Sequence, residues 1–99
     1  MPYAFVQDVP ADENIYALIK ELLPAHPPGL IAHIALKRDG GLRYVDVWDT
    51  QEYWDRFRAD HVEPAVEKVL AGFGIPHTHD DVNIEPVDVV DVWLGESAS

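Results

Sequence analysis

His33 and Asp46 are the pair in this sequence best suited to acid–base chemistry, and their spacing can bring them together. They lie in two β-rich runs, 29–38 and 42–48, which flank Asp39-Gly40-Gly41. Asp-Gly is a strong signal for a two-residue hairpin turn. If Asp39-Gly40 forms that turn, His33 stands directly opposite Asp46, where the carboxylate can orient the imidazole and fix its tautomer. A three-residue turn would separate the pair.

The same register divides the side chains of the hairpin between two faces of the sheet, because successive side chains alternate along a strand. The first face carries Ile31, His33, Ala35, Tyr44, Asp46 and Trp48. The second is aliphatic apart from Arg43 near the turn, and carries Leu30, Ala32, Ile34, Leu36, Val45 and Val47. A His-Asp dyad flanked by Tyr44 and Trp48 suits general-base work on an acidic C–H or O–H in an aromatic pocket. The alternative is a satisfied polar contact within an apolar face.

A second set of candidate residues follows the hairpin. Tyr53, Phe57 and His61 recur at four-residue steps, so they share one side of a predicted helix. If that side meets the first face of the hairpin, His61 joins His33 at one pocket. The alternative is that the aromatic residues belong to the core, as such stripes usually do, and that His61 is exposed at a break before Pro64.

The tract His77-Thr78-His79-Asp80-Asp81 has metal-ligating side chains, but zinc-type partner spacing is absent elsewhere in the sequence. We therefore expect a solvated loop and no metal site. Walker, Rossmann, G-x-S-x-G and H-E-x-x-H motifs are absent as well, which argues against nucleotide-binding, serine hydrolase and metalloprotease functions.

The elements that must position these residues follow in the order β-α-β-β-α-β. Strands are predicted at 3–9, 29–38, 42–48 and 83–94. One helix is predicted after Asp12, and a second after Asp49 or Thr50, resuming at Pro64 and ending at 72–74. This order predicts a ferredoxin-like α+β fold with an antiparallel sheet and both helices on one of its faces. Residues 1–99 form one domain with a frayed tail at 95–99.

The amino-acid composition argues against some classes of binding partner. Seven Lys and Arg against eighteen Asp and Glu give a net charge of −11, which repels phosphate backbones and anionic membranes, so we expect neither nucleic acid nor membrane as a partner. Cysteine is absent, which excludes a thiolate nucleophile and cysteine-ligated metal sites.

The sequence also has no signal-peptide pattern and no stretch of about 20 apolar residues, which favours a cytoplasmic location. A chain this short buries little of its own surface, so we expect a homodimer formed through the aliphatic sheet faces.

The segment 42–70 resembles the dimeric α+β barrel superfamily and looks most like its antibiotic biosynthesis monooxygenase-like branch. There a strand ending in Trp, here Trp48, is followed by an acidic or Ser cap and an aromatic helix. The resemblance implies two sheets packed face to face, and a pocket between sheet and helices lined by Trp48. The sequence resembles the haem-degrading members of the superfamily less closely. Gln7 is the best match to their strand-one Asn, and the helix His that ligates haem falls near Val66, so haem binding would need His61 instead.

Together these features favour a small tailoring enzyme, a cofactor-independent oxygenase or cyclase acting on an aromatic or polyketide-like ligand. Its first step would be deprotonation of a bound phenol or enol by His33, with Asp46 orienting the base, Tyr44 donating a hydrogen bond and His61 as a further catalytic candidate. The alternatives are a non-catalytic small-molecule binding or sensing protein on the same scaffold, and a haem-binding or haem-degrading protein. The candidates for ligand contacts are Phe5, Gln7, Ile31, Trp48, Tyr53 and Phe57.

Overall fold

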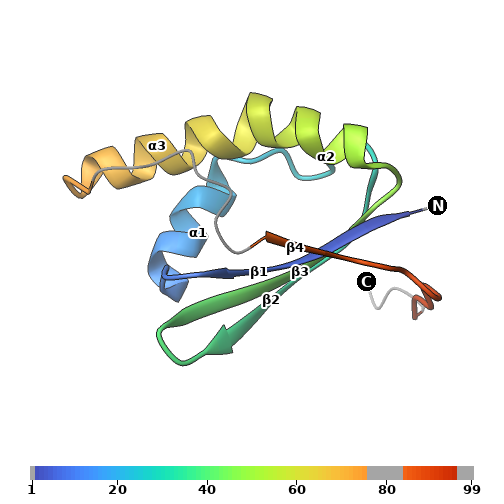
Figure 1. The fold of residues 1–99 in the computed structure, drawn as a ribbon. Helices are drawn as coiled ribbons and strands as arrows, with labels where there is room; N and C mark the ends of the chain where they lie inside the picture. Colours follow the sequence, from blue (N-terminus) through green and yellow to red (C-terminus); the bar gives the residue numbers. More distant parts are fainter. Residues whose placement is uncertain (1, 76–83, 96–99) are drawn as a thin grey trace.

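In the computed structural model, which describes residues 2–75 and 84–95, the helices all lie on one face of an antiparallel sheet (Figure 1). The strands are β1 (Tyr3–Val9), β2 (Leu30–Arg38), β3 (Gly41–Trp48) and β4 (Ile84–Val87). The helical elements are α1 (Glu13–Glu21), α2 (Gln51–Phe57), the π-helical turn η1 (Arg58–Val62) and α3 (Glu63–Gly72). The strand order β2-β3-β1-β4 is that of a ferredoxin-like sheet. The predicted α+β class and order of elements are confirmed.

The hairpin of β2 and β3 has the register on which the candidate dyad depends. Arg38 pairs with Gly41, so Asp39-Gly40 is the turn, and His33 pairs with Asp46. Gly40 has a φ of 80°, a left-handed conformation that glycine adopts without steric cost. The prediction that His33 faces Asp46 is therefore confirmed.

One residue near the start of β2 departs from the expected alternation. Leu30 pairs with Trp48 and Ala32 pairs with Val47, so Ile31 is an extra residue that forms a β-bulge. The bulge turns Leu30 to the same face as Trp48, where it packs against the aromatic core. Placing Leu30 on the aliphatic outer face was therefore wrong, because regular alternation does not hold across a bulge.

Both helical segments begin with a side-chain cap. The Asp12 carboxylate accepts a hydrogen bond from the Ile15 N–H at 2.8 Å, and α1 follows as expected. The Thr50 hydroxyl accepts one from the Tyr53 N–H at 3.3 Å, so Thr50, and not Asp49, caps α2. These caps satisfy N–H groups that have no partner within the helix.

The helix after β3 continues without a break, and α2, η1 and α3 form one long rod across the sheet (Figure 1). In η1 the Glu63 N–H bonds to the Arg58 carbonyl five residues back, the hydrogen bond of a π-helix. Pro64, in the first turn of α3 as predicted, lacks an N–H and would clash with the carbonyl four residues back in a regular helix. A widened turn before it relieves this conflict, so a π-helical turn replaces the predicted break.

The fourth strand is shorter than predicted. The expected strand was 83–94, whereas β4 comprises only Ile84–Val87, and residue 83 lies outside the described part of the chain. Val87 already pairs with Ala4 near the beginning of β1, so the following residues pass the end of their only neighbouring strand. The apolar side chains of Val90 and Trp93 are consequently 98% and 92% exposed.

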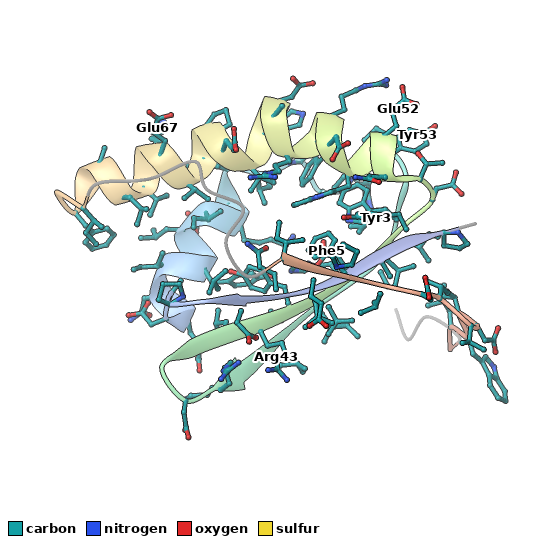
Figure 2. All side chains as sticks on the ribbon, in the orientation of Figure 1. Tyr3, Phe5, Arg43, Glu52, Tyr53 and Glu67 are labelled. Carbon is teal, nitrogen blue, oxygen red and sulfur yellow. The ribbon has the colours of Figure 1, made fainter. Side chains whose placement is uncertain are left out.

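The core lies between the sheet and the helices and consists of Phe5, Trp48, Trp54 and Phe57. Figure 2 shows Phe5 on this inner side and Arg43 on the opposite face of the sheet, while Glu52 and Glu67 project outward from the long helix. The helices of the described residues are each too short or too polar to cross a membrane.

Candidate active site

A cavity of about 470 Å³ opens between the sheet and the helices, within the size range of small-molecule sites. The sheet contributes Phe5, Gln7, Leu30, Ile31, Ala32, His33, Tyr44, Asp46 and Trp48. The helices contribute Tyr16, Ile19, Lys20, Trp54, Phe57, Val62 and Val66, and the segment 23–27 closes one side. The predicted pocket face of the hairpin lines this cavity through Ile31, His33, Tyr44, Asp46 and Trp48, and Leu30 and Ala32, which were predicted on the other face, line it as well.

A buried carboxylate holds the candidate base in place. Asp46 is only 4% exposed, and one of its oxygens lies 2.6 Å from His33 Nδ1. Its other oxygen accepts a hydrogen bond from the Trp48 indole N–H at 3.1 Å. Because a carboxylate only accepts hydrogen bonds, Nδ1 carries a proton, and Nε2 of the neutral imidazole is left as the acceptor.

Tyr16 on α1 completes the chain of polar contacts. Its hydroxyl lies 2.9 Å from His33 Nε2 and donates a hydrogen bond to that nitrogen. Residue spacing did not single out Tyr16, because it lies among the apolar residues of the predicted helix and its contact is with a strand 17 residues away. The only local sign is that it precedes Ile19 by three residues, the spacing of neighbours on one helix face.

Tyr44 packs against both members of this contact. Its ring centroid lies 5.6 Å from that of Tyr16 and 5.3 Å from that of His33. Burial raises the pKa of the Tyr44 phenol to about 12, with smaller contributions from Tyr16 and Asp46. Burial, followed by Asp46, also raises the pKa of Tyr16. Both phenols therefore stay protonated at neutral pH and can donate hydrogen bonds to a ligand.

The raised pKa of Tyr44 has a measurable consequence. An absorbance titration of the folded protein should contain one phenol that ionises near pH 12, and Tyr44→Phe should remove that component. Because the folded pKa exceeds the ordinary value of 10, the stabilisation is complete below pH 10 and is lost as the pH rises through 12. If every tyrosine of the folded protein ionises near pH 10, the burial of Tyr44 is contradicted.

Two residues predicted to join the site lie outside it. His61 is exposed and does not line the cavity, as in the alternative of an exposed histidine beside core aromatic residues, so it is not a catalytic candidate that joins His33; its ring lies 5.4 Å from that of Phe57. In the wide turn of η1, the residue that returns to the core after Phe57 is Val62, five positions later, and not His61. Tyr53 is 37% exposed and covers Gly29, where an added Cβ would lie 2.3 Å from the tyrosine ring.

The other predicted contact residues, Phe5, Gln7, Ile31, Trp48 and Phe57, all line the cavity. Trp54, which packs 4.7 Å from Phe5 between ring centroids, lines it too. Most of the wall is therefore apolar and aromatic, and one group of polar side chains lies together at Tyr16, His33 and Asp46.

Among the described residues, the candidate ligands for a metal or a haem do not gather at this cavity. Residues 77–81, the His-rich tract, lie outside the described residues, and within residues 2–75 and 84–95 no three His, Cys, Asp or Glu side chains form a metal-binding group. Val66, near the position of the haem-ligating His in the resemblance, lines the cavity without a ligating atom. The substitute, His61, lies outside it, so these residues do not fit a haem ligated from the second helix.

Comparison with known proteins gives matches only at the level of structure. Neither a family model nor a curated protein matches the sequence. A crystal structure described as an antibiotic biosynthesis monooxygenase is similar with a TM-score of 0.60 and 21% identity, covering 92% of this chain and 100% of its own. A second structure described with that name, from Chloroflexus aurantiacus, has a TM-score of 0.55 and 15% identity, covering 97% and 98%. The chain therefore has the ferredoxin-like α+β fold of these antibiotic biosynthesis monooxygenase structures.

Proposed function

We propose that this protein is a small-molecule tailoring enzyme, an oxygenase or cyclase that needs no cofactor and acts on an aromatic or polyketide-like ligand. One observation carries the proposal: the Tyr16–His33–Asp46 chain of hydrogen bonds borders an otherwise largely apolar cavity of suitable size. A base held by a buried carboxylate in such a pocket suits proton abstraction from a phenol or enol. The names of the two similar structures contain the word monooxygenase, which supports the oxygenase form of this proposal.

The first step is transfer of a ligand proton to His33 Nε2. Tyr16 occupies that nitrogen in the free protein, so a ligand hydroxyl either displaces Tyr16 or passes its proton through the Tyr16 oxygen while Tyr16 gives its own proton to Nε2. The resulting imidazolium is stabilised by Asp46. Tyr44 is placed to donate a hydrogen bond to the ligand anion.

The ligand anion can then react with dioxygen, as in an oxygenase, or with a carbonyl of the same ligand, as in a cyclase. In an oxygenase, dioxygen is the second substrate; oxidation of a ring methylene to a carbonyl places one oxygen atom on the ligand and releases the other as water with the two hydrogens removed. This reaction balances without an external reductant. In a cyclase, the enolate carbon attacks a carbonyl of the same ligand, and the alkoxide formed recovers the proton from His33.

A screen of phenols, polycyclic ketones with an acidic methylene, and poly-β-ketones tests this proposal. We expect ligand binding to quench the fluorescence of Trp48 and Trp54, which line the cavity, and at least one ligand to give oxygen uptake or a cyclised product by mass spectrometry. Ligands that bind tightly and are recovered unchanged would favour the second candidate, a binding or sensing protein. That candidate is supported by the fact that Nε2 already has a hydrogen-bond donor.

We also propose that two copies pair through the sheet face that carries no helices. The register places Ile34, Leu36 and Val87 on that face, and they are 51%, 45% and 40% exposed. Apolar side chains gathered in this way are typical of an interface.

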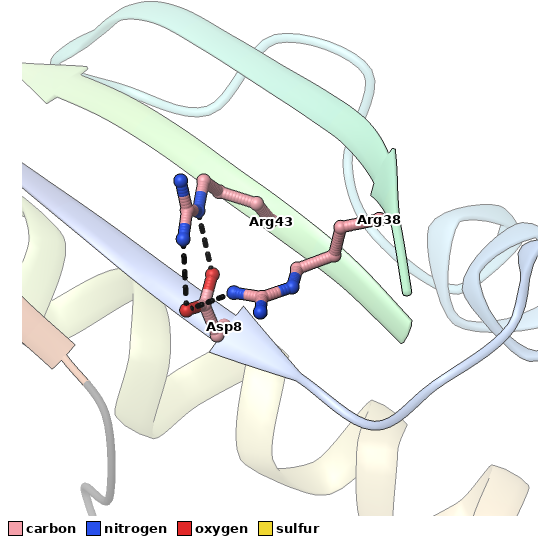
Figure 3. A network of polar contacts seen from close by, with 3 residues as sticks. All are labelled: Asp8, Arg38 and Arg43. Carbon is pink, nitrogen blue, oxygen red and sulfur yellow. Dashed lines mark hydrogen bonds and ion pairs between the residues drawn. The ribbon is translucent and has the colours of Figure 1, made fainter. Parts of the chain in front are cut away.

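An ion cluster marks the hairpin end of the same face. Asp8 accepts hydrogen bonds from Arg43 at 2.8 and 3.2 Å and from Arg38 (Figure 3). These bonds, led by Arg43, lower the pKa of Asp8 to about 2. The cluster gives the proposed apolar interface a charged border, as expected at the rim of an interface.

Ile34→Asp tests the interface. Burying an unpaired carboxylate there should raise the dimer dissociation constant by at least about tenfold, so size-exclusion chromatography with light scattering should show a fall from the mass of two chains to that of one. Ala35→Asp is the matched control, since it adds the same charge to a neighbouring exposed residue on the other face. A wild-type protein that is monomeric at the same concentration, or equal effects of both substitutions, would contradict this interface.

A further inference from the structure

The charged groups around the cavity are unevenly distributed. Of the described residues that line it, Asp46 and Lys20 carry charges at neutral pH, and both oxygens of Asp46 already accept hydrogen bonds. Neither Lys20 nor Lys68 makes an ion pair with a carboxylate of the described residues, whereas Lys37 pairs with Glu13 at 3.0 Å, and of these three lysines Lys20 alone lines the cavity. In a protein with a net charge of −11, a lysine without such a pair at the edge of an apolar cavity is the feature that requires an explanation.

The position of Lys20 relative to the candidate base follows from α1. Lys20 comes four residues after Tyr16, one helical turn and a rise of about 6 Å along the helix. Tyr16 contacts His33, so Lys20 lies beyond the base, toward the end of α1 and the segment 23–27 that closes one side of the cavity. His26 in that segment is exposed and also lines the cavity. One end of the cavity therefore holds the candidate base His33 with Tyr16, and the other end holds Lys20 and His26.

We infer that the ligand is an aromatic hydroxy acid whose carboxylate binds Lys20 while its hydroxyl lies at Tyr16 and His33. This inference rests on the proposed function and adds the substrate class. The Lys20 ammonium supplies up to three N–H donors, and the imidazole of His26 can supply another. Ile19, which lies between Tyr16 and Lys20 on α1 and lines the cavity, gives an apolar surface for the ring system, and Leu23 lines the cavity beyond Lys20. A single lysine matches a singly charged carboxylate better than a phosphate, which is usually held by several donors or by arginine.

The geometry also limits the length of the ligand. The rise of about 6 Å along α1 between Tyr16 and Lys20 favours an acid group that lies about this far from the reacting hydroxyl, or farther. Fused rings with the two groups at opposite ends meet this condition, whereas an acid next to the hydroxyl does not. The probe is therefore 6-hydroxy-2-naphthoic acid. Its methyl ester is the control ligand, because it has the same rings and hydroxyl but no carboxylate charge.

Isothermal titration calorimetry of both probes with four proteins tests the inference. The wild type should bind the acid about two- to fivefold more tightly than the ester, as one exposed ion pair can provide. Lys20→Gln should remove that preference by weakening the acid alone, and Lys20→Arg should retain it. Lys68→Gln on α3, which removes the same charge away from the cavity lining, should leave the preference intact.

The outcomes separate this inference from the proposed function. Equal affinity for acid and ester, or an equal loss in Lys20→Gln and Lys68→Gln, overturns the carboxylate site while leaving the pocket and its base in place. Failure of both probes to bind the wild type overturns this inference and counts against the proposed aromatic ligand as well.

Discussion

Replacing His33 with Gln is expected to lower the turnover of a phenol or enol substrate by about 10² to 10⁴, the usual contribution of a positioned general base. Glutamine can still accept a hydrogen bond from Tyr16 and donate one to Asp46, and so replace both side-chain hydrogen bonds of His33. It cannot take up a proton at neutral pH. The loss should therefore fall on kcat, measured by oxygen uptake or product formation, while ligand affinity changes little.

The matched control for this substitution is His61→Gln. His61 is exposed and lies outside the cavity lining, so its replacement should leave kcat within about twofold, as expected for a surface change away from special features. Circular dichroism establishes that both variants are folded. If His33→Gln retains full turnover while Tyr16→Phe abolishes it, Tyr16 is the base, and His33 is not.

Trp48→Ala is expected to produce the largest loss of stability. Trp48 is 1% exposed and packs against Trp54 and Phe57 with ring centroids 5.6 and 5.2 Å apart. Truncating such a residue costs about 3–5 kcal/mol, and a native domain has only about 5–15 kcal/mol in total. The substitution also removes the indole donor from the buried Asp46 carboxylate, which adds to the cost.

Urea denaturation followed by circular dichroism measures this effect. Phe73→Ala, which truncates an aromatic residue that is 56% exposed at the end of α3, is the control and should cost less than about 1 kcal/mol. Trp48→Phe should lie between the two, because it keeps most of the packing and loses the hydrogen bond. A midpoint for Trp48→Ala no lower than that for Phe73→Ala would mean that the aromatic cluster is not the main core.

The part of the site carried by the hairpin could be predicted because its geometry is local. Asp39-Gly40 fixes the turn, the turn fixes the register, and the register pairs His33 with Asp46. Tyr16 could not be found in this way. Its contact with His33 depends on how α1 lies over the sheet, which results from packing of the whole core and has no counterpart in residue spacing.

The errors have the same origin. The apolar residues at 87–94 resemble a strand, but a strand also needs a neighbour, and Val87 already lies beside the beginning of β1. Leu30 lies on the face opposite to the predicted one because β2 contains one bulged residue. His61 was placed by a period of 3.6 residues, which does not hold through η1. In each case the local pattern was present, and a longer-range backbone constraint decided the outcome.

The π-helical turn also sets the rotational phase between the two halves of the long helix. Upstream, Trp54 and Phe57 face the core, and downstream Ala65 and Val69 do so. The π-helical turn holds one residue more than an α-helical turn before the chain returns to the same face, so a chain shortened by one residue within η1 can form a regular α-helix and keep its downstream apolar pattern facing the core. In a relative that lacks one residue within η1, we also expect a residue other than proline at the position of Pro64. Without the wide turn, a proline there would clash with the carbonyl four residues before it.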